Sequence, residues 1–342
     1  MMFFAFVGCN NSSPIESPDN SEPVEITYYK ADLDYFNSRR YTATITENQN
    51  YIFWADNEGL HKYNKKTKET YLLLSTVNID FLLIHCDKLY YVENEEKLCR
   101  IDFDAKLVET IFELDKNYMS QIQDYTVSDG KVFFLNTHTL FYYDISSKSI
   151  NELKSTTVEA LQVVGDDIYF TDHGERTNTI YIYSMRDHSC RALLGDGKCT
   201  PAEKAYIDFR IVNDTVYYTQ AIPSGTYAMP LDGESKIIRD GRVVFACDSS
   251  VSKGVYYMSY STDESHLYFH DNNGNEFVAC FSMMELNLST GVSVVDGYAY
   301  YNSGVERVLD DTGHYIYNYD KAKPTAKQIN ENIVKAENDP LS

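Results

Sequence analysis

The sequence predicts an all-β repeat fold, and two observations support this prediction. A run of one apolar residue followed by two aromatics recurs at intervals of 36–48 residues. Hardly any segment shows a helical period, whereas alternating apolar and polar residues surround each run. A period near 40–45 residues is typical of a four-stranded propeller blade. The expected fold is therefore a β-propeller of four-stranded blades, with seven blades favoured and six or eight as alternatives. The runs are Ile52-Phe53-Trp54, Leu89-Tyr90-Tyr91, Val132-Phe133-Phe134, Ile168-Tyr169-Phe170, Val216-Tyr217-Tyr218, Val255-Tyr256-Tyr257 and Ala299-Tyr300-Tyr301.

Each copy of the repeat predicts four strands separated by turns. In the first copy these strands cover residues 42–46, 51–54, 60–63 and 69–74. The second copy predicts 81–84, 89–92, 98–101 and 107–112, and the third predicts 125–127, 132–135, 140–143 and 150–153. In the last four copies the third strands are expected at 180–183, 227–229, 267–269 and 315–319. Turn residues separate the strands, as in Ser128-Asp129-Gly130 and Asp296-Gly297.

The aromatic runs are expected to be core residues. A middle strand of a blade is covered on both faces by neighbouring blades, so both of its alternating faces must be apolar. Two adjacent aromatics supply wide apolar groups to the two faces. The runs therefore indicate packing and not a cofactor site.

Size and charge limit the architecture and the partners. A single repeat array can use most of a 342-residue chain, and we expect one propeller domain over residues 24–335 with a C-terminal tail at 336–342. Lys and Arg total 30 against 51 Asp and Glu, which gives a formal charge of −21. This charge argues against nucleic acid or an anionic lipid surface as the partner. No run approaches the ~18–20 apolar residues that a transmembrane helix needs.

The first nine residues contain a Gly-Cys pair after an apolar stretch. Phe6-Val7-Gly8-Cys9 resembles the lipobox of bacterial lipoproteins, in which the Cys becomes the lipidated first residue of the mature protein. This resemblance implies a truncated signal over residues 1–9, lipidation at Cys9 and an extracytoplasmic, membrane-anchored location. Residues 10–23 have the composition of a flexible tether. The alternative is a frayed apolar N-terminus with an accidental Gly-Cys.

One tetrad is more specific than the general repeat. Tyr169-Phe170-Thr171-Asp172 resembles the Tyr-Trp-Thr-Asp repeat of low-density-lipoprotein-receptor-type propellers. Phe53-Trp54-Ala55-Asp56 and Tyr217-Tyr218-Thr219-Gln220 are similar, and Leu231-Asp232-Gly233 resembles a turn of the same repeats. The chain is thus similar to bacterial lipoproteins that carry uncharacterised propellers of this kind.

Metal and cofactor motifs are absent from the sequence. His266 and His270 have helical ligand spacing, but in a strand four residues span about 13 Å, which is too far for one metal ion. Gly195-Asp196-Gly197-Lys198 lacks the Ser or Thr of a phosphate loop, and Asp271 to Glu276 is better explained as a hairpin turn than as half a calcium loop. We therefore expect no metal and no cofactor.

The cysteines leave two interpretations open. Cys190 and Cys199 flank one loop and are the candidate disulfide, while Cys86 with Cys99 and Cys247 with Cys280 each fall within one repeat. Buried thiols are the alternative.

Connection lengths give the only candidate site. Between the second and third strands, the first three copies have short connections. The last four copies have longer expected connections, over residues 171–179, 220–226, 259–266 and 302–314. Binding residues often lie on long loops of a rigid scaffold. The candidate binding residues are Asp172, His173, Glu175, Arg176, Asp263, Glu264, Glu306, Arg307 and Asp310.

The sequence therefore favours a lipid-anchored binding or scaffolding module that is monomeric. Its expected partner is a protein or a polysaccharide of the cell envelope, and catalysis is not expected. The alternative function is a glycan-active lyase or hydrolase that uses carboxylates of the long-loop face, because propellers host both kinds of function. A third hypothesis, an envelope-assembly factor, differs from the first only in its partner.

Overall fold

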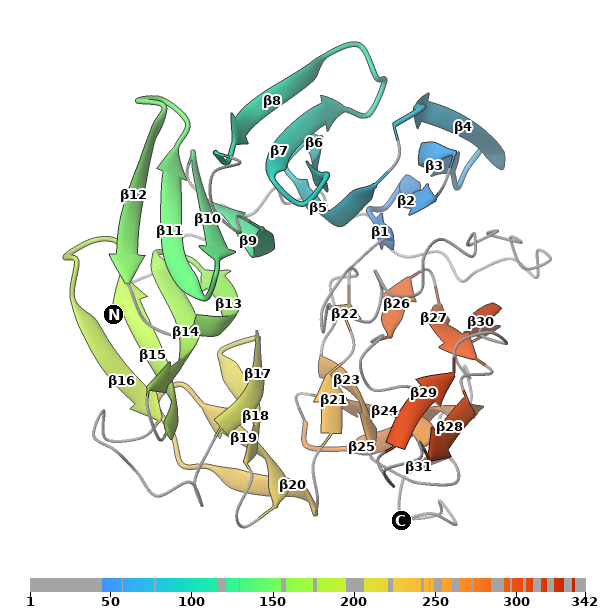
Figure 1. Cartoon of the computed structure of the whole chain (residues 1–342). Coiled ribbons are helices and arrows are strands. Elements are labelled where there is room, and N and C mark those ends of the chain that lie inside the picture. Colours follow the sequence, from blue (N-terminus) through green and yellow to red (C-terminus); the bar gives the residue numbers. More distant parts are fainter. Residues whose placement is uncertain are drawn as a thin grey trace.

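The structure is a computed structural model, and every regular element among its described residues is a β-strand. The strands form sheets that stand side by side around a ring (Figure 1). The described part contains no helix with the length and hydrophobicity that a membrane crossing requires. The expected all-β fold and the β-propeller arrangement are confirmed. The described residues are 45–56, 58–76, 78–115, 121–128, 130–154, 158–174, 177–194, 206–220, 224–240, 243–245, 247–248, 254–259, 265–271, 273–283, 292–295, 297–303, 306–309, 315–318, 323–328 and 334–335.

Five sheets consist of four consecutive antiparallel strands each. Sheet 1 contains β1 (Ile45–Glu47), β2 (Tyr51–Asp56), β3 (Gly59–Asn64) and β4 (Glu69–Leu74). Sheet 2 contains β5 (Ile79–His85), β6 (Lys88–Glu93), β7 (Lys97–Asp102) and β8 (Val108–Glu113). Sheet 3 contains β9 (Ile122–Ser128), β10 (Lys131–Asn136), β11 (Thr139–Asp144) and β12 (Ser149–Lys154). Sheet 4 contains β13 (Val158–Val164), β14 (Asp167–Gly174), β15 (Thr177–Ser184) and β16 (Cys190–Leu194). Sheet 5 contains β17 (Tyr206–Val212), β18 (Thr215–Gln220), β19 (Gly225–Pro230) and β20 (Lys236–Asp240).

The remaining sheets depart from this simple order. Sheet 6 has five strands, β21 (Val243–Phe245), β23 (Gly254–Ser259), β24 (Ser265–Asp271), β25 (Glu276–Met283) and β31 (Val334–Lys335). Sheet 7 has four, β22 (Cys247–Asp248), β26 (Ser293–Val295), β27 (Tyr298–Ser303) and β30 (Lys323–Gln328), with β22 parallel to β26. β28 (Glu306–Leu309) and β29 (Tyr315–Asn318) form a separate hairpin.

The number of blades lies within the expected range. Six of the described sheets have four strands, and six blades is one of the expected values. The favoured value of seven stays a prediction, because sheet 6 has a fifth strand and differs from the four-stranded pattern.

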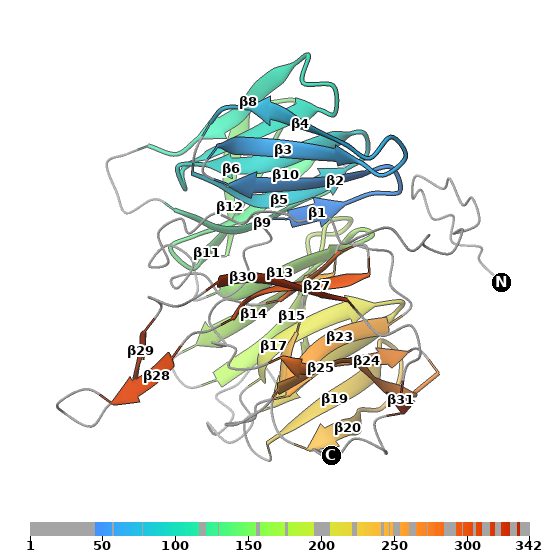
Figure 2. The same ribbon diagram turned by 90° about the vertical axis from the view of Figure 1, so that its right-hand side faces the viewer.

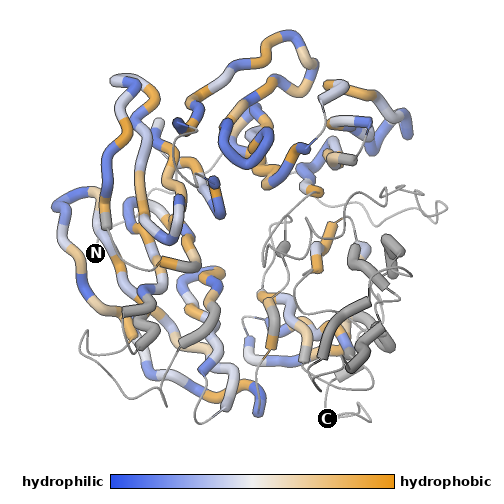
Figure 3. The backbone as a smooth tube through the Cα atoms, viewed as in Figure 1, coloured by the Kyte–Doolittle hydropathy of each residue, from blue (hydrophilic) through white to orange (hydrophobic). Residues whose placement is uncertain are grey.

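The aromatic runs occupy the middle strands, as expected, and every residue of the first five runs is buried. In β6, Tyr91 packs toward sheet 1 and Tyr90 toward sheet 3. In β10, Phe134 packs toward sheet 2 and Phe133 toward sheet 4. Consecutive strand residues face opposite sides, so each run gives one aromatic to each neighbouring sheet. Hydrophilic and hydrophobic residues accordingly alternate along the strands (Figure 3).

The ring closes by packing between its first and last sheets. Ile45, Ile52, Trp54 and Tyr63 of sheet 1 form one apolar cluster with Val295 of sheet 7. Full burial of such side chains stabilises the fold by ~1.5–3 kcal/mol each. Closure therefore depends on the same inter-sheet packing as the rest of the ring.

Hydrogen bonds between neighbouring sheets accompany this apolar packing. Lys62 Nζ donates to the carbonyl of Phe103 at 2.7 Å between sheets 1 and 2. Tyr125 Oη donates to the carbonyl of Phe81 at 2.6 Å between sheets 2 and 3. Gln162 of β13 bonds both backbone groups of Ile211 in β17, donating at 2.7 Å and accepting at 2.8 Å. These bonds fix the register of neighbouring sheets, which apolar contacts alone would leave less defined.

Candidate functional site

One end of the ring differs from the other, and the candidate residues Asp172 and His173 lie at it. At this end the inner strands β5, β9, β13 and β17 begin and the middle strands turn into the third strands. We call it the turn face. Several connections here are tight: the register pairs Asp56 with Gly59, Asn136 with Thr139, and Gly174 with Thr177. Two residues remain in each of these turns.

The expected long connections need correction. The expectation of a loop over residues 171–179 is wrong, because β14 continues to Gly174 and β15 begins at Thr177. The connection expected over 220–226 is shorter, since Gln220 pairs with Gly225. The strand expected at 315–319 is not the third strand of its sheet. It lies in β29, and β30 takes the third position beside β27.

Local irregularity recurs where the inner strands begin. Each of β5, β9, β13 and β17 shows a register shift against its middle strand near the turn face. In sheet 4 the backbone N–H of Ala160 donates to Thr171 Oγ1 at 3.1 Å. The threonine side chain therefore satisfies a backbone donor at the register shift between β13 and β14. Such bulges redirect side chains and are common beside binding sites.

The register brings acidic residues to corresponding places on these inner strands. Asp80 pairs with Val92, Asp124 with Leu135, and Asp208 with Thr219. Each pairing lies near the turn-face end of its middle strand. The sequence analysis missed these three aspartates. The recurrence of Ile-Asp-Phe at residues 79–81 and 207–209, with Asp124-Tyr125 between them, is the signal that identifies them.

Buried polar side chains also gather toward the turn face. Thr171 and Asp172 are buried near the end of β14, as are Thr219 and Gln220 at the end of β18. These are the polar halves of the tetrads Tyr169-Phe170-Thr171-Asp172 and Tyr217-Tyr218-Thr219-Gln220. Thr226 and His266, near the starts of β19 and β24, are buried as well. Within each tetrad, the aromatic residues pack in the core between sheets, and the polar residues lie buried near the turn face.

Asp80 has the most perturbed carboxyl of the turn face. It is 1% exposed, and burial, followed by the nearby charge of Glu95, raises its pKa to about 8. The turn that holds Glu95 is fixed from the next sheet, since Ile122 donates its backbone N–H to the Glu95 carbonyl at 2.7 Å and Gln121 bonds the Glu95 carboxylate. At neutral pH the Asp80 carboxyl is therefore mostly protonated.

Metal-binding groups do not come together in the described part of the chain. No three His, Cys, Asp or Glu side chains there are placed to hold a metal ion. His266 and His270 both lie in β24, which confirms the strand that excluded them as a ligand pair. His270 is buried with its Nδ1 unpartnered, and burial lowers its pKa, although Asp271 opposes this shift.

The cysteines of sheet 2 lie in different environments. Cys86 is exposed and Cys99 is buried, and no bridge joins them. Cys190 is exposed at the start of β16, whereas Cys199 lies outside the described residues, so the candidate disulfide stays a prediction.

The sequence-predicted site residues are placed only in part. Asp172 is buried near the end of β14, and His173 pairs in the backbone with Asn178 of β15. Glu306 and Arg307 begin β28. Outside the described residues lie Glu175, Arg176, Asp263, Glu264, Asp310 and Cys9.

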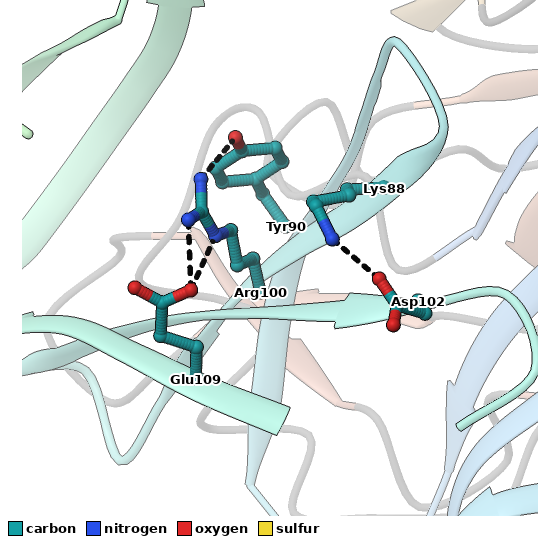
Figure 4. A network of polar contacts seen from close by, with 5 residues as sticks. All are labelled: Lys88, Tyr90, Arg100, Asp102 and Glu109. Carbon is teal, nitrogen blue, oxygen red and sulfur yellow. Dashed lines mark hydrogen bonds and ion pairs between the residues drawn. The ribbon is translucent and has the colours of Figure 1, made fainter. Parts of the chain in front are cut away.

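A second polar network lies within sheet 2 and extends toward the opposite end of the ring (Figure 4). Arg100 binds the Glu109 carboxylate through Nε at 2.9 Å and Nη2 at 2.7 Å, and its Nη1 donates to Tyr90 Oη at 3.4 Å. Lys88 pairs with Asp102 between the neighbouring strands. The four charged side chains are partly exposed and pair across adjacent strands, so each ion pair adds at most ~1 kcal/mol of stability. This network stabilises the sheet and is not a candidate site.

Comparison with known proteins supports the fold. No protein-family model matches the chain, and no curated protein matches it. Among solved structures, an oligogalacturonate lyase from Vibrio parahaemolyticus is similar with a TM-score of 0.58 and 11% identity, over 82% of this chain and 88% of that one. An oligogalacturonate lyase in complex with manganese gives 0.56 and 10%, over 82% and 86%. These likenesses show the fold alone.

A third solved structure is a surface protein. PorZ, a component of the type-IX secretion system of Porphyromonas gingivalis, is similar with a TM-score of 0.57 and 12% identity. The match covers 87% of this chain but 38% of PorZ, so the chain spans less than half of that protein.

Proposed function

We propose that the chain is a lipid-anchored, extracytoplasmic β-propeller that binds a protein or a cell-wall glycan through its turn face. The observation that carries this proposal is the gathering of buried polar side chains and inner-strand aspartates toward that face. Buried polar groups cost free energy unless they are satisfied, so a fold that retains several at one end favours a role for that end. The resemblance of Phe6-Val7-Gly8-Cys9 to a lipobox supports the location.

The net charge of the chain limits the chemical class of the expected ligand. A formal charge of −21 favours a cationic or hydroxyl-rich partner over a phosphate-bearing one. PorZ is a bacterial surface component, and this agrees with an extracytoplasmic role for a similar fold.

The binding experiment compares matched charge removals at the two ends of the ring. The full chain is titrated by calorimetry with peptidoglycan fragments, oligogalacturonate and a basic protein such as lysozyme. The turn-face variant combines Glu95→Gln, Asp124→Asn and Asp172→Asn, and the control combines Asp144→Asn, Asp166→Asn and Asp187→Asn. We expect the turn-face variant to weaken binding of one probe by about tenfold or more and the control to leave it within about twofold.

Two results would contradict the proposal. Equal weakening by both variants would indicate a general charge effect, and unchanged binding by both would place the ligand elsewhere. Replacing Arg176 and Arg307 with Ala supplies a further check. If every bound probe remains bound with unchanged affinity, the long-loop residues have no part in recognition.

Anchoring is tested separately. In cells that process lipoproteins, the native protein should fractionate with membranes, and Cys9→Ala should release it. A Cys190→Ala control should leave the fractionation unchanged. Membrane association that survives loss of Cys9 would contradict lipidation at this residue.

A second candidate function is a glycan-active lyase or hydrolase. The observation that favours it is the Asp80 carboxyl, whose raised pKa is the property of a general acid, together with the likeness of the fold to oligogalacturonate lyases. A catalytic carboxyl must reach its substrate, and Asp80 is 1% exposed. We therefore rank binding first. Release of unsaturated or reducing sugar ends by the native chain, abolished by Asp80→Asn, would reverse this order.

A further inference from the structure

The hairpin of β28 and β29 is an insertion that sheet 7 does not need. β27 and β30 are antiparallel neighbours, and their paired ends Ser303 and Lys323 lie opposite one another. A short turn would join these ends, as residues 57–58 join Asp56 to Gly59 in sheet 1. Instead residues 304–322 separate them in the sequence, and the described strands of this segment, β28 and β29, are not part of sheet 7. We call the β28–β29 hairpin within this insertion the arm.

The arm makes a sheet of its own. Glu306 pairs with Asn318, and Leu309 pairs with Tyr315, so the two strands match along their full lengths. No other described strand pairs with either one. Figure 2 shows the arm projecting away from the body of the ring. An isolated two-stranded hairpin is marginally stable in water, so an arm in this position gains stability from a further strand.

The residue pattern of the arm is unlike that of a solvated hairpin. Successive pairs of a β-ribbon face opposite sides. The adjacent pairs Val308–Ile316 and Leu309–Tyr315 therefore put apolar residue types at positions on both faces. The pairs Glu306–Asn318 and Arg307–Tyr317 put polar residue types on the same two faces, so the apolar types are gathered in the half of the arm next to the connection between β28 and β29. A cluster of apolar positions at the end of a hairpin favours contact with another molecule.

We propose that the arm docks on a basic protein partner by adding to an exposed strand edge of that protein. This inference rests on the proposed binding function and selects a protein, rather than a glycan, as the partner. No described strand pairs with the outer edges of the arm, so strand addition gives them a ladder of backbone hydrogen bonds, which a glycan cannot offer. The net charge of −21 is complementary to a basic partner and speeds the encounter.

The first experiment uses a defined probe with a matched backbone control. The probe is an alternating Lys-Val octapeptide, and the control is the same peptide with N-methyl groups on alternate amides. Both have the same charge, but the control cannot extend a sheet on one edge. We expect the full chain to bind the unmodified peptide at least about tenfold more tightly than the control.

The second experiment removes the arm and leaves the propeller intact. Residues 304–322 are replaced by Asn-Gly, a two-residue turn suited to the antiparallel ends of β27 and β30. We expect this variant to lose the preference for the unmodified peptide while it unfolds at the same temperature as the full chain within a few degrees. Hydrogen exchange at residues 306–309 and 315–318 of the full chain should slow when the peptide is bound.

Three outcomes would overturn the inference. One is equal binding of both peptides. Another is exchange at the arm that the bound peptide does not slow. The third is light scattering that shows a dimer of the full chain and a monomer of the variant, which would assign the arm to a second copy. If peptidoglycan or oligogalacturonate binds the full chain and the variant alike, the proposed binding function stands and the arm inference fails.

Discussion

The two ends of the ring satisfy their polar groups in opposite ways. Away from the turn face, short side chains satisfy the turns locally. Asn48 accepts from the backbone N–H groups of Asn50 and Tyr51, and Asn64 accepts from those of Lys66 and Thr67. Most of the buried polar side chains lie toward the turn face, at strand ends and beside bulges, while Glu47 and His270 are buried at the other end.

Asp144 and Asp80, which lie at opposite ends of the ring, have pKa shifts of opposite sign. Hydrogen bonds from the Ser146 side chain and the Ser147 backbone lower the pKa of Asp144 to about 2. Burial raises the pKa of Asp80 to about 8. The same residue type thus stabilises its charged form at one end and its neutral form at the other. The turn face retains groups that oppose folding at neutral pH, which is typical of functional ends of a protein.

The largest effect is expected for Asp80→Asn. Below about pH 4 the Asp80 carboxyl is protonated in both the folded and the unfolded chain. As the pH rises toward 8, the unfolded chain ionises this group while the folded chain keeps the proton, so the native protein loses stability. The variant does not titrate there. We expect it to be more stable than the native protein by on the order of 5 kcal/mol at pH 8, with the difference falling below about 1 kcal/mol near pH 4.

Urea unfolding at pH 4, 6 and 8 checks this prediction. The matched control is Asp166→Asn, at the surface beside Arg186, which should show no such gain. A difference between Asp80→Asn and the native protein that does not change with pH would contradict the buried, protonated carboxyl.

An intermediate effect is expected for Thr171→Val. Thr171 is fully buried, and its hydroxyl accepts the hydrogen bond from the Ala160 N–H. Val keeps the shape and the strand preference but leaves this donor unsatisfied, which costs about 1–3 kcal/mol. The control is Ser146→Ala at the opposite end, where water replaces the lost partner of Asp144 and the change stays within about 0.5 kcal/mol. Equal losses in the two variants, measured by thermal and urea unfolding, would remove the contrast between the ends.

The smallest effect is expected for Asp144→Ala. The lowered pKa means that the folded chain favours the ionised carboxylate, so its contribution to stability is present above about pH 4 and is lost as the pH falls through about 2. The variant should therefore be slightly less stable than the native protein at pH 7 and equal to it near pH 2. Circular dichroism during acid titration of both proteins measures this. A deficit that grows as the pH falls would contradict the turn role of Asp144.

Sequence reasoning predicted the core better than the candidate site. The first three copies of the repeat gave strands that match β2 to β12 closely, because turn residues and aromatic runs mark both ends of each strand, and the first expected strand overlaps β1 at residues 45–46. It failed after Asp172, where β14 continues through residues of low strand preference such as His173 and Gly174. Residues 315–319 were predicted as the third strand of the seventh repeat, but they pair with β28 and not with β27. A strand-forming sequence does not reveal which strand it pairs with.

The sequence by itself determined the repeat, and elementary strand geometry explains why each copy carries an aromatic pair. An aromatic pair in each middle strand follows from two facts: adjacent strand residues face opposite sides, and each sheet lies between two others. Only the tertiary structure decided which polar residues are buried. Asp80 and Asp144 are ordinary aspartates in a sequence, and they titrate near pH 8 and pH 2 because of burial in one case and hydrogen bonding in the other. The placement of the arm likewise depends on the pairing of β27 with β30, which joins residues far apart in the chain.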